Sequence, residues 1–239
     1  MTSIGGHDDG HYDRDHACRC RHCQSRRGAV FDRLGLDYCC HGTRSIVEAS
    51  KAAGLDPDLV TSELAVLDAG DTEWATLDPA ALAEHIVEQH HRYLHEELPL
   101  LDALAAKVLS VHGERHPELA EVRRLVAALR EDLDPHLMKE ERILFPAIAA
   151  LAAGQTEFPF GSIANPIRMM TLEHDGAGEL LESLRSATGD YTAPADACAS
   201  YQSLYQRLAD IEADTHLHVH KENHVLFPAA LRMAGAAED

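Results

Sequence analysis

Hydrophobic and polar residues follow a helical period through the larger part of this chain. Hydrophobic residues recur every three or four positions, as at Leu125, Leu129 and Leu133, which places them on one face of an α-helix. Strand-like alternation is absent from this part of the sequence. Four long segments with short connections therefore predict an all-α fold, an antiparallel four-helix bundle. The segments are residues 78–111, 117–153, 163–187 and 195–233.

The chain before residue 78 has a different character. Residues 1–27 are rich in His, Asp, Arg, Gly and Cys and show no hydrophobic period, which predicts a poorly ordered tail. Residues 28–77 predict a small helical N-terminal domain, whose few hydrophobic residues favour packing against a partner. Residues 78–239 then contain the bundle.

The composition is that of an ordinary globular protein, with 45% hydrophobic and 26% charged residues. No segment approaches the roughly 20 hydrophobic residues of a membrane helix, and the N-terminus lacks the hydrophobic stretch of a secretory signal. We therefore expect a cytoplasmic protein that does not enter a membrane. The net charge of -19 and the lack of a basic stripe disfavour nucleic acid as a partner.

The second and fourth segments share an internal repeat. Its pattern is His-x-x-x-Glu-x-x-x-x-Phe-Pro, which begins at His136 in one segment and at His218 in the other. A four-residue step places the histidine and the glutamate, Glu140 or Glu222, on one helix face. The hydrophobic residues that follow indicate that this face points inward. Because a buried charge is costly unless it is paired or binds a metal, the repeat indicates either two internal His–Glu hydrogen bonds or a metal site.

The first and third segments each add a histidine at a comparable depth in the bundle, His91 and His174. Mixed nitrogen and oxygen ligands suit a pair of iron ions, with the two glutamates as bridges, and they also suit manganese. Zinc fits less well, because its structural sites are usually tetrahedral and hold one ion. The candidate ligands are His91, His136, Glu140, His174, His218 and Glu222.

Other histidines require separate assignment. His112 lies 21 residues after His91, about 31 Å along a helix at 1.5 Å per residue, so both cannot reach one compact site. A second set of histidines lies next to the candidate ligands along the chain. We expect some of these to support the ligands and most to face solvent. They are His85, His90, His95, His216, His220 and His224.

Two groups of cysteines occur near the N-terminus. Cys39 and Cys40 are adjacent, which strains an internal disulfide, so they are either structural residues or thiols with redox or metal chemistry. Cys18, Cys20 and Cys23 have a spacing that matches no zinc motif well, and we assign them to the poorly ordered tail.

These motifs together resemble the Repair of Iron Centres family. Asp37-Tyr38-Cys39-Cys40 with Gly42 is similar to the small N-terminal domain of that family. The double His-x-x-x-Glu pattern with Phe-Pro resembles its hemerythrin-like bundle, together with His91 and with Glu173-His174-Asp175. The likeness covers about residues 28–235.

This resemblance implies a non-haem di-iron centre that is bridged by an oxo group and by the carboxylates of Glu140 and Glu222. It implies His91, His136, His174 and His218 as terminal ligands. It also implies a homodimer formed through the N-terminal domain, with Cys39 and Cys40 as functional thiols, so that these two residues are the candidates for a catalytic role.

The resemblance implies repair of iron–sulfur clusters damaged by oxidative or nitrosative stress, with damaged or apo iron–sulfur proteins as partners. The first interpretation is that the protein donates iron to these clusters. An enzyme that reduces nitric oxide at the iron pair, and a hemerythrin-like sensor of O2, NO or iron, are the alternatives. Oxygen-carrying hemerythrins have a further histidine four residues after the third-helix ligand. Gly178 stands there in this chain, which argues against reversible oxygen transport.

Overall fold

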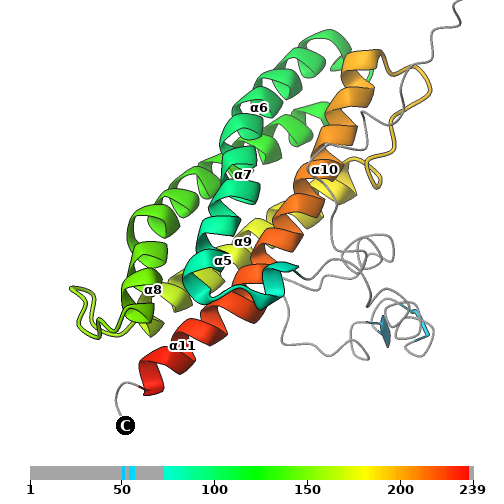
Figure 1. The fold of residues 1–239 in the computed structure, drawn as a ribbon. Helices are drawn as coiled ribbons and strands as arrows, with labels where there is room; N and C mark the ends of the chain where they lie inside the picture. Colours follow the sequence, from blue (N-terminus) through cyan, green and yellow to red (C-terminus); the bar gives the residue numbers. More distant parts are fainter. Residues whose placement is uncertain (1–49, 52–53, 57–72, 237–239) are drawn as a thin grey trace, which may run out of the picture.

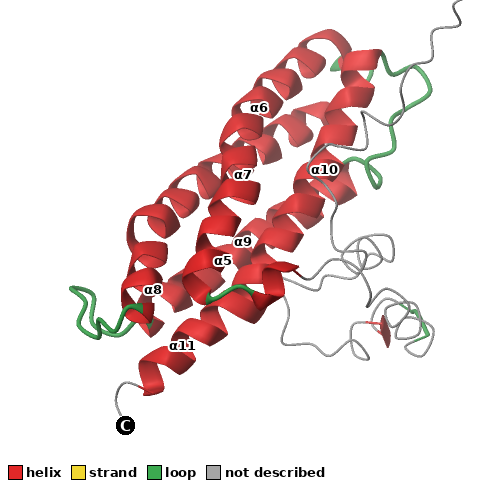
Figure 2. Ribbon diagram, viewed as in Figure 1, coloured by secondary structure: helices red, strands yellow, loops and turns green. Residues whose placement is uncertain are grey.

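The fold is a bundle of four long helical segments, seen in a computed structural model that describes residues 50–51, 54–56 and 73–236 (Figure 1). Within these ranges the regular elements are helices, joined by loops (Figure 2). They are η1 (Glu73–Thr76), α5 (Pro79–Ile86), η2 (Val87–His91), α6 (Arg92–His112), α7 (Glu118–Lys139), η3 (Glu140–Leu144), α8 (Phe145–Ala152), α9 (Ala164–Ala187), α10 (Ala199–Lys221), η4 (Glu222–Leu226) and α11 (Phe227–Ala236).

The four segments pack in the order of the chain. α6 packs against α7, α7 against α9, α9 against α10, and α10 against α6, which closes a ring of four helices. Short connections make neighbouring helices antiparallel. The predicted all-α, four-helix architecture is therefore confirmed, and the observed helix ends lie within a few residues of the predicted ones.

The start of the first segment shows how the sequence defines a helix end. Asp78 is the N-cap of α5, and its side chain accepts a hydrogen bond from the backbone N–H of Ala81 at 2.9 Å. Pro79 follows in the first turn, where its missing N–H costs nothing. At the end of α8, Gly154 has φ +93°, a left-handed conformation that suits glycine and ends the helix.

Three of the four segments contain one turn of π-helix, and each such turn touches a predicted ligand. The turn η2 ends at His91, η3 begins at Glu140, and η4 begins at Glu222. A π-turn widens the helix locally and changes the direction of the side chains around it. Such turns occur frequently at functional sites, and here they mark the level at which the candidate ligands converge.

The core consists of two hydrophobic clusters with a polar layer between them. One cluster is built mainly from α6, α7, α9 and α10, and the other mainly from α5, α8, α11 and the first turns of α9. Each segment passes from one cluster to the other at the polar layer. In the first segment, for example, Ile86 belongs to the second cluster and Leu94 to the first, with His91 between them.

Several predictions fall on residues outside the described ranges. The tail 1–27 and the thiols Cys39 and Cys40 lie entirely outside them, as does most of the N-terminal domain at 28–77. The domain boundaries, the homodimer and the role of the two cysteines therefore stay predictions.

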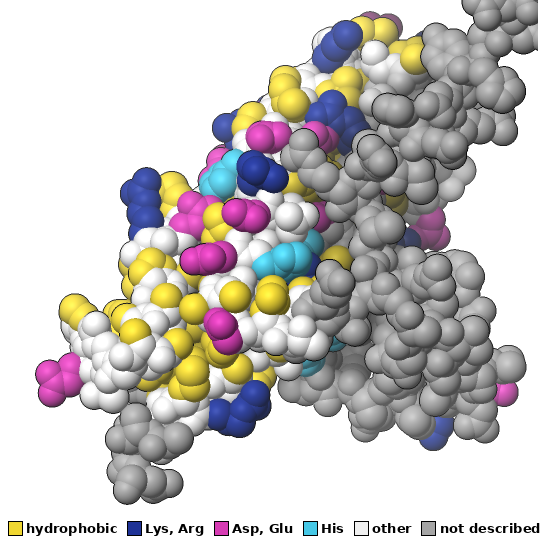
Figure 3. Space-filling model, in the orientation of Figure 1, with side chains coloured by type: hydrophobic (Ala, Val, Ile, Leu, Met, Phe, Trp, Pro, Cys, Tyr) yellow, Lys and Arg dark blue, Asp and Glu magenta, His cyan; other side chains and the backbone are white. Residues whose placement is uncertain are grey.

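Within the described residues, no helix is both long enough and apolar enough to cross a membrane. On the face drawn in Figure 3, acidic and basic side chains are interspersed along the bundle, and hydrophobic ones gather toward the end that carries α8 and α11.

Candidate metal centre

The six candidate ligands meet in the polar layer, and all are buried. They form two groups of four residues, in each of which one ligand atom per residue lies within 4.8 Å of the others. Both groups contain Glu140 and Glu222. The first group adds His91 and His218, and the second adds His136 and His174.

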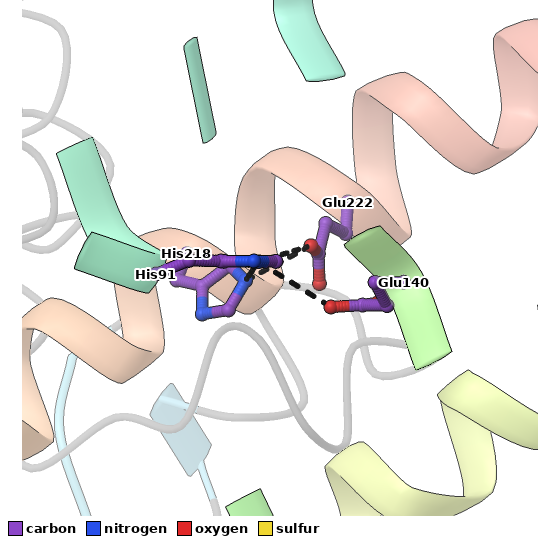
Figure 4. A group of neighbouring side chains, drawn as sticks. All are labelled: His91, Glu140, His218 and Glu222. Carbon is purple, nitrogen blue, oxygen red and sulfur yellow. Dashed lines mark hydrogen bonds and ion pairs between the residues drawn. The ribbon is translucent and has the colours of Figure 1, made fainter. Parts of the chain in front are cut away.

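The first group joins the first, second and fourth segments. The Nε2 atoms of His91 and His218 lie 3.1 Å apart, and Nε2 of His218 lies 2.9 Å from Oε1 of Glu222. Nε2 of His91 lies 3.5 Å from Oε2 of Glu140. Figure 4 shows both imidazoles facing the two carboxylates, so that four donor atoms point toward one another.

The second group joins the second, third and fourth segments in the same way. The Nε2 atoms of His136 and His174 lie 3.1 Å apart. Oε2 of Glu140 lies 3.3 Å from Nε2 of His136, and Oε2 of Glu222 lies 3.1 Å from Nε2 of His174. Each glutamate therefore contributes to both groups, while each histidine contributes to one.

The carboxylates in this layer are left with unused acceptor atoms. Both oxygens of Glu140 and Oε2 of Glu222 are buried and accept no hydrogen bond of good geometry from the described residues. Of the two internal His–Glu hydrogen bonds that the repeat allows, the one between His218 and Oε1 of Glu222 forms, and it leaves these three oxygens unused. Buried carboxylate oxygens without hydrogen bonds fit a bound cation, which is the alternative that the sequence left open.

The pKa values of the candidate ligands also fit a bound cation. Burial raises the pKa of Glu222, but His218 and the other imidazoles beside it outweigh this effect and hold the pKa well below its usual range. Burial also lowers the pKa of His136, yet the nearby Glu140 carboxylate raises it to about 10. His91 has a raised pKa for the same reason. Protons on His91 and His136 therefore balance the buried carboxylates, and a metal ion would displace them.

Three of the four histidines are held at their second ring nitrogen. Nδ1 of His91 donates to Glu141 at 3.0 Å, Nδ1 of His136 donates to Glu173 at 2.9 Å, and Nδ1 of His174 donates to Asn223 at 3.0 Å. Such bonds set the tautomer that leaves Nε2 free to bind a metal, and they orient the ring. Nδ1 of His218 is buried and has no hydrogen-bond partner among the described residues.

The Phe-Pro part of the repeat packs on histidines of neighbouring segments. Phe145 stacks on His91 with ring centroids 5.4 Å apart, and Phe227 stacks on His174 at 6.0 Å. The repeat thus supplies a histidine, a carboxylate and a hydrophobic wall from each of two helices.

Some flanking histidines were expected to support the ligands, and His90, which is buried, contacts one of them. Nδ1 of His90 donates to Asp214 at 2.9 Å, and its Nε2 accepts from the buried ammonium group of Lys221 at 2.8 Å. Lys221 also donates to His85 at 3.0 Å and lies 5.4 Å from the centroid of the Trp74 ring. Burial and Lys221 hold the pKa of His90 well below its usual range, so this ring is neutral.

His112 lies at the opposite end of α6, as its separation from His91 along the helix requires. Its Nε2 is 3.1 Å from the sulfur of Cys198, far from the polar layer.

A cavity of about 340 Å³ opens beside the centre. Three candidate ligands line it, His136, His174 and His218, and charged residues such as Glu131 and Glu173 lie in its wall. The cavity therefore borders both histidines of the second group and one histidine of the first.

Sequence reasoning did not identify the residues that hold these histidines. Glu141, Glu173 and Asn223 each adjoin a ligand along the chain, which is the only signal that could have marked them. Each contacts a histidine on a different helix, and the sequence does not state which helices are neighbours.

Comparison with known proteins agrees with this geometry. The hemerythrin HHE cation binding domain family matches residues 82–230, and the ScdA_N family, a domain of unknown function (DUF542), matches residues 24–68.

Relatives also match along most of the chain. The iron-sulfur cluster repair protein YtfE of Cronobacter sakazakii is 36% identical over 208 residues, which cover 86% of this chain and 91% of that protein. YtfE of Escherichia coli O1:K1 is 35% identical over the same shares of both chains. The chain therefore belongs to the Repair of Iron Centres family, the group of the YtfE proteins, and its four-helix bundle is a hemerythrin-type cation-binding domain.

Proposed function

We propose that this protein holds two iron ions in the polar layer and supplies iron to iron–sulfur clusters damaged by oxidative or nitrosative stress. The observation that carries the proposal is the sharing of both glutamates by two groups of ligands. One ion would lie between His91 and His218, and the other between His136 and His174. Glu140 and Glu222 would bridge them.

The donor set suits a centre that binds iron and also gives it up. Four imidazole nitrogens and two carboxylates match the preference of iron for mixed nitrogen and oxygen ligands. No thiolate takes part among these six residues, so iron is not held by the soft ligands of a cluster-type site. The partners Glu141, Glu173 and Asn223 keep the imidazoles aimed at the ions.

The relatives support the choice of client. They carry the name iron-sulfur cluster repair protein, and their likeness covers 86% of this chain. We extend that role to this chain as a proposal, with proteins that carry damaged or missing clusters as partners. Cys39 and Cys40 are proposed to act on iron or on the client through their thiols, in the part of the chain that precedes the bundle.

Metal content tests the first half of the proposal. Protein purified without added metal is expected to contain about two iron ions per chain by mass spectrometry, because each four-residue group would hold one. The variant Glu140→Leu removes a ligand shared by both positions and serves as the matched control. One zinc ion or no metal in the wild-type protein would contradict a di-iron centre.

Repair of a damaged enzyme tests the second half. An iron–sulfur hydratase inactivated by peroxide or NO is incubated with the iron-loaded protein, and its recovered activity is compared with that after incubation with Glu140→Leu. Recovery with the wild-type protein alone supports iron donation. Absence of recovery, together with conversion of NO to nitrous oxide by the reduced protein, would favour nitric oxide reduction instead.

A further inference from the structure

The two metal positions are built from an internal repeat whose halves differ at the residues beside the ligands. Glu141 in one half corresponds to Asn223 in the other, and each accepts a hydrogen bond from a ligand histidine, His91 or His174. The difference that costs a ligand its hydrogen bond lies elsewhere.

The second and fourth segments both read His-x-x-Lys-Glu, beginning at His136 and at His218. The first and third segments supply the other histidine of each pair. The residue just before that histidine is Glu173 in the third segment and His90 in the first. A carboxylate in one half therefore corresponds to an imidazole in the other.

In the half that contains His136, this carboxylate holds the ligand. Nδ1 of His136 donates to Glu173 at 2.9 Å. Lys139 donates to the other oxygen of the same carboxylate. The ligand imidazole, the carboxylate and the lysine thus form one chain of hydrogen bonds.

In the half that contains His218, the corresponding residues meet without that bond. His90 lies flat on the imidazole of His218, with ring centroids 5.4 Å apart and ring planes 3° from parallel. Lys221, which corresponds to Lys139, donates to Nε2 of His90 at 2.8 Å. His90 therefore occupies the place of Glu173 and stacks on the ligand where Glu173 accepts a hydrogen bond from it.

His90 has no acceptor to offer His218. Its Nε2 lone pair is used by Lys221, and its Nδ1–H is used by Asp214 at 2.9 Å. The lone pair of an imidazole also lies in the ring plane, so it cannot point into a ring stacked above it. This explains why Nδ1 of His218, which is buried, has no partner among the described residues.

We propose that the two iron positions differ in strength and that the ion between His91 and His218 is the one released first. This inference rests on the proposed function, because it assumes two iron ions in the polar layer. The residue that makes the difference is His90, which positions His218 by stacking in place of a hydrogen bond. Loss of a partner of this kind lowers metal affinity by roughly 10- to 100-fold.

The cavity in the protein surface borders ligands of both metal positions. The cavity beside the centre is lined by His218 as well as by His136 and His174. The lining includes both histidines of one position and one histidine of the other, so access alone does not favour the position that we propose to release first. The proposal rests on how the ligands are held.

Iron release to a chelator tests the inference. Iron-loaded protein is mixed without oxygen with an excess of a ferrous chelator, and the coloured complex is followed over time. We expect two phases of one ion each, whose rates differ by about 10-fold or more. Release of both ions in a single phase would overturn the inference.

One variant in each half of the centre identifies the position from which iron leaves first. His90→Glu places a carboxylate where His218 can donate to it and where Lys221 can pair with it, so the fast phase is expected to slow toward the slow one. Glu173→Gln weakens the opposite half, so the slow phase is expected to become about 10-fold faster. Glu179→Gln, an exposed carboxylate of α9, is the control and changes neither phase. A fast phase that His90→Glu leaves unchanged would assign the released ion to the other position.

His90→Glu also removes one partner of Asp214 and places a second carboxylate beside it, which destabilises the fold. The double variant with Asp214→Asn replaces the Asp214 carboxylate by a neutral amide, and helical content by circular dichroism shows whether each protein folds.

The release experiment separates the inference from the proposed function. If the two ions leave in two phases but restore no damaged enzyme, the two positions differ in strength and the repair function is refuted. If the two ions leave in one phase and restore a damaged enzyme, repair is supported and the difference between the positions is refuted.

Discussion

Histidines and carboxylates gather at two places along α6, and the two gatherings differ in kind. Near one end is the polar layer, where Glu140 is fully buried and accepts no hydrogen bond of good geometry from the described residues. At the other end His112 contacts Cys198 at 3.1 Å, and Nε2 of His116 lies 3.1 Å from Asp196, whose side chain is 49% exposed. We call this second set, with Glu118, the distal cluster.

The difference teaches that residue types alone do not make a metal site. In the distal cluster each histidine has a nearby partner, and water reaches the carboxylates. Among the described residues, the groups arranged to hold an ion comprise the six ligands of the polar layer and none of the distal cluster. Four donor atoms must converge, and burial must leave the carboxylates without other partners.

The largest effect is expected from Glu140→Leu. This change removes a ligand common to both groups, so iron content is expected to fall from about two ions per chain to none. The matched variant in the distal cluster, Asp196→Leu, is expected to keep both ions. Mass spectrometry of the purified proteins measures the contents. Two ions retained by Glu140→Leu would refute the role of Glu140 as a bridge.

The next largest effect is a pH dependence of iron affinity. In the metal-free protein the pKa of His136 is about 10 and that of His91 is well above its usual value, so both rings carry protons at pH 7. Iron must displace both protons. Affinity is expected to rise by about 10-fold per pH unit from pH 7 to 9 because of His136 alone, and more steeply wherever His91 is also protonated. Competition with a chelator at several pH values measures this.

The distal cluster provides a control for this slope. Asp196 raises the pKa of His116, so this residue also titrates at a higher pH than usual. Because it does not touch the polar layer, His116→Ala is expected to leave the slope unchanged. A slope altered by that variant would show that the two regions are coupled.

A smaller effect is expected from Glu141→Gln. Glu141 accepts the hydrogen bond of His91, and this bond holds the pKa of Glu141 at about 2, so the carboxylate is charged at any ordinary pH. The amide keeps the shape and loses the charge, and we expect iron affinity to fall about 10-fold. The corresponding change in the distal cluster, Glu118→Gln, should leave iron affinity as it is. Equal losses in both variants would point to a general change in stability.

The smallest effect on iron is expected from His112→Ala. This variant should keep two ions per chain, because His112 lies outside both ligand groups. It removes a buried ring that contacts Cys198 and packs at 5.5 Å from Tyr201, so the free energy of unfolding should fall by about 1–3 kcal/mol. Denaturant unfolding and metal analysis of the same preparation measure both. Loss of iron without loss of stability would contradict the separation of the two regions.

Much of the fold could be predicted because its signals are local. Hydrophobic spacing such as Leu125, Leu129 and Leu133 depends only on the helix period, and all three residues are buried. Asp78 and Pro79 mark a helix start through hydrogen bonds made within one turn. The candidate ligands could be named for the same reason, since a His and a Glu four residues apart share a face wherever the helix lies.

The tertiary structure decided which of these residues meet and how each is held. Glu173 and His90 occupy corresponding places before a ligand, yet one accepts a hydrogen bond and the other stacks. The sequence did not show which flanking histidines are buried. His90 is one of them, because the packing of α10 against η2 brings Asp214 and Lys221 to its two nitrogens. The sequence by itself determined the helices and the faces that carry the donor groups. Contacts between helices depend on how those faces rotate and pack against one another, and this is a property of the whole bundle.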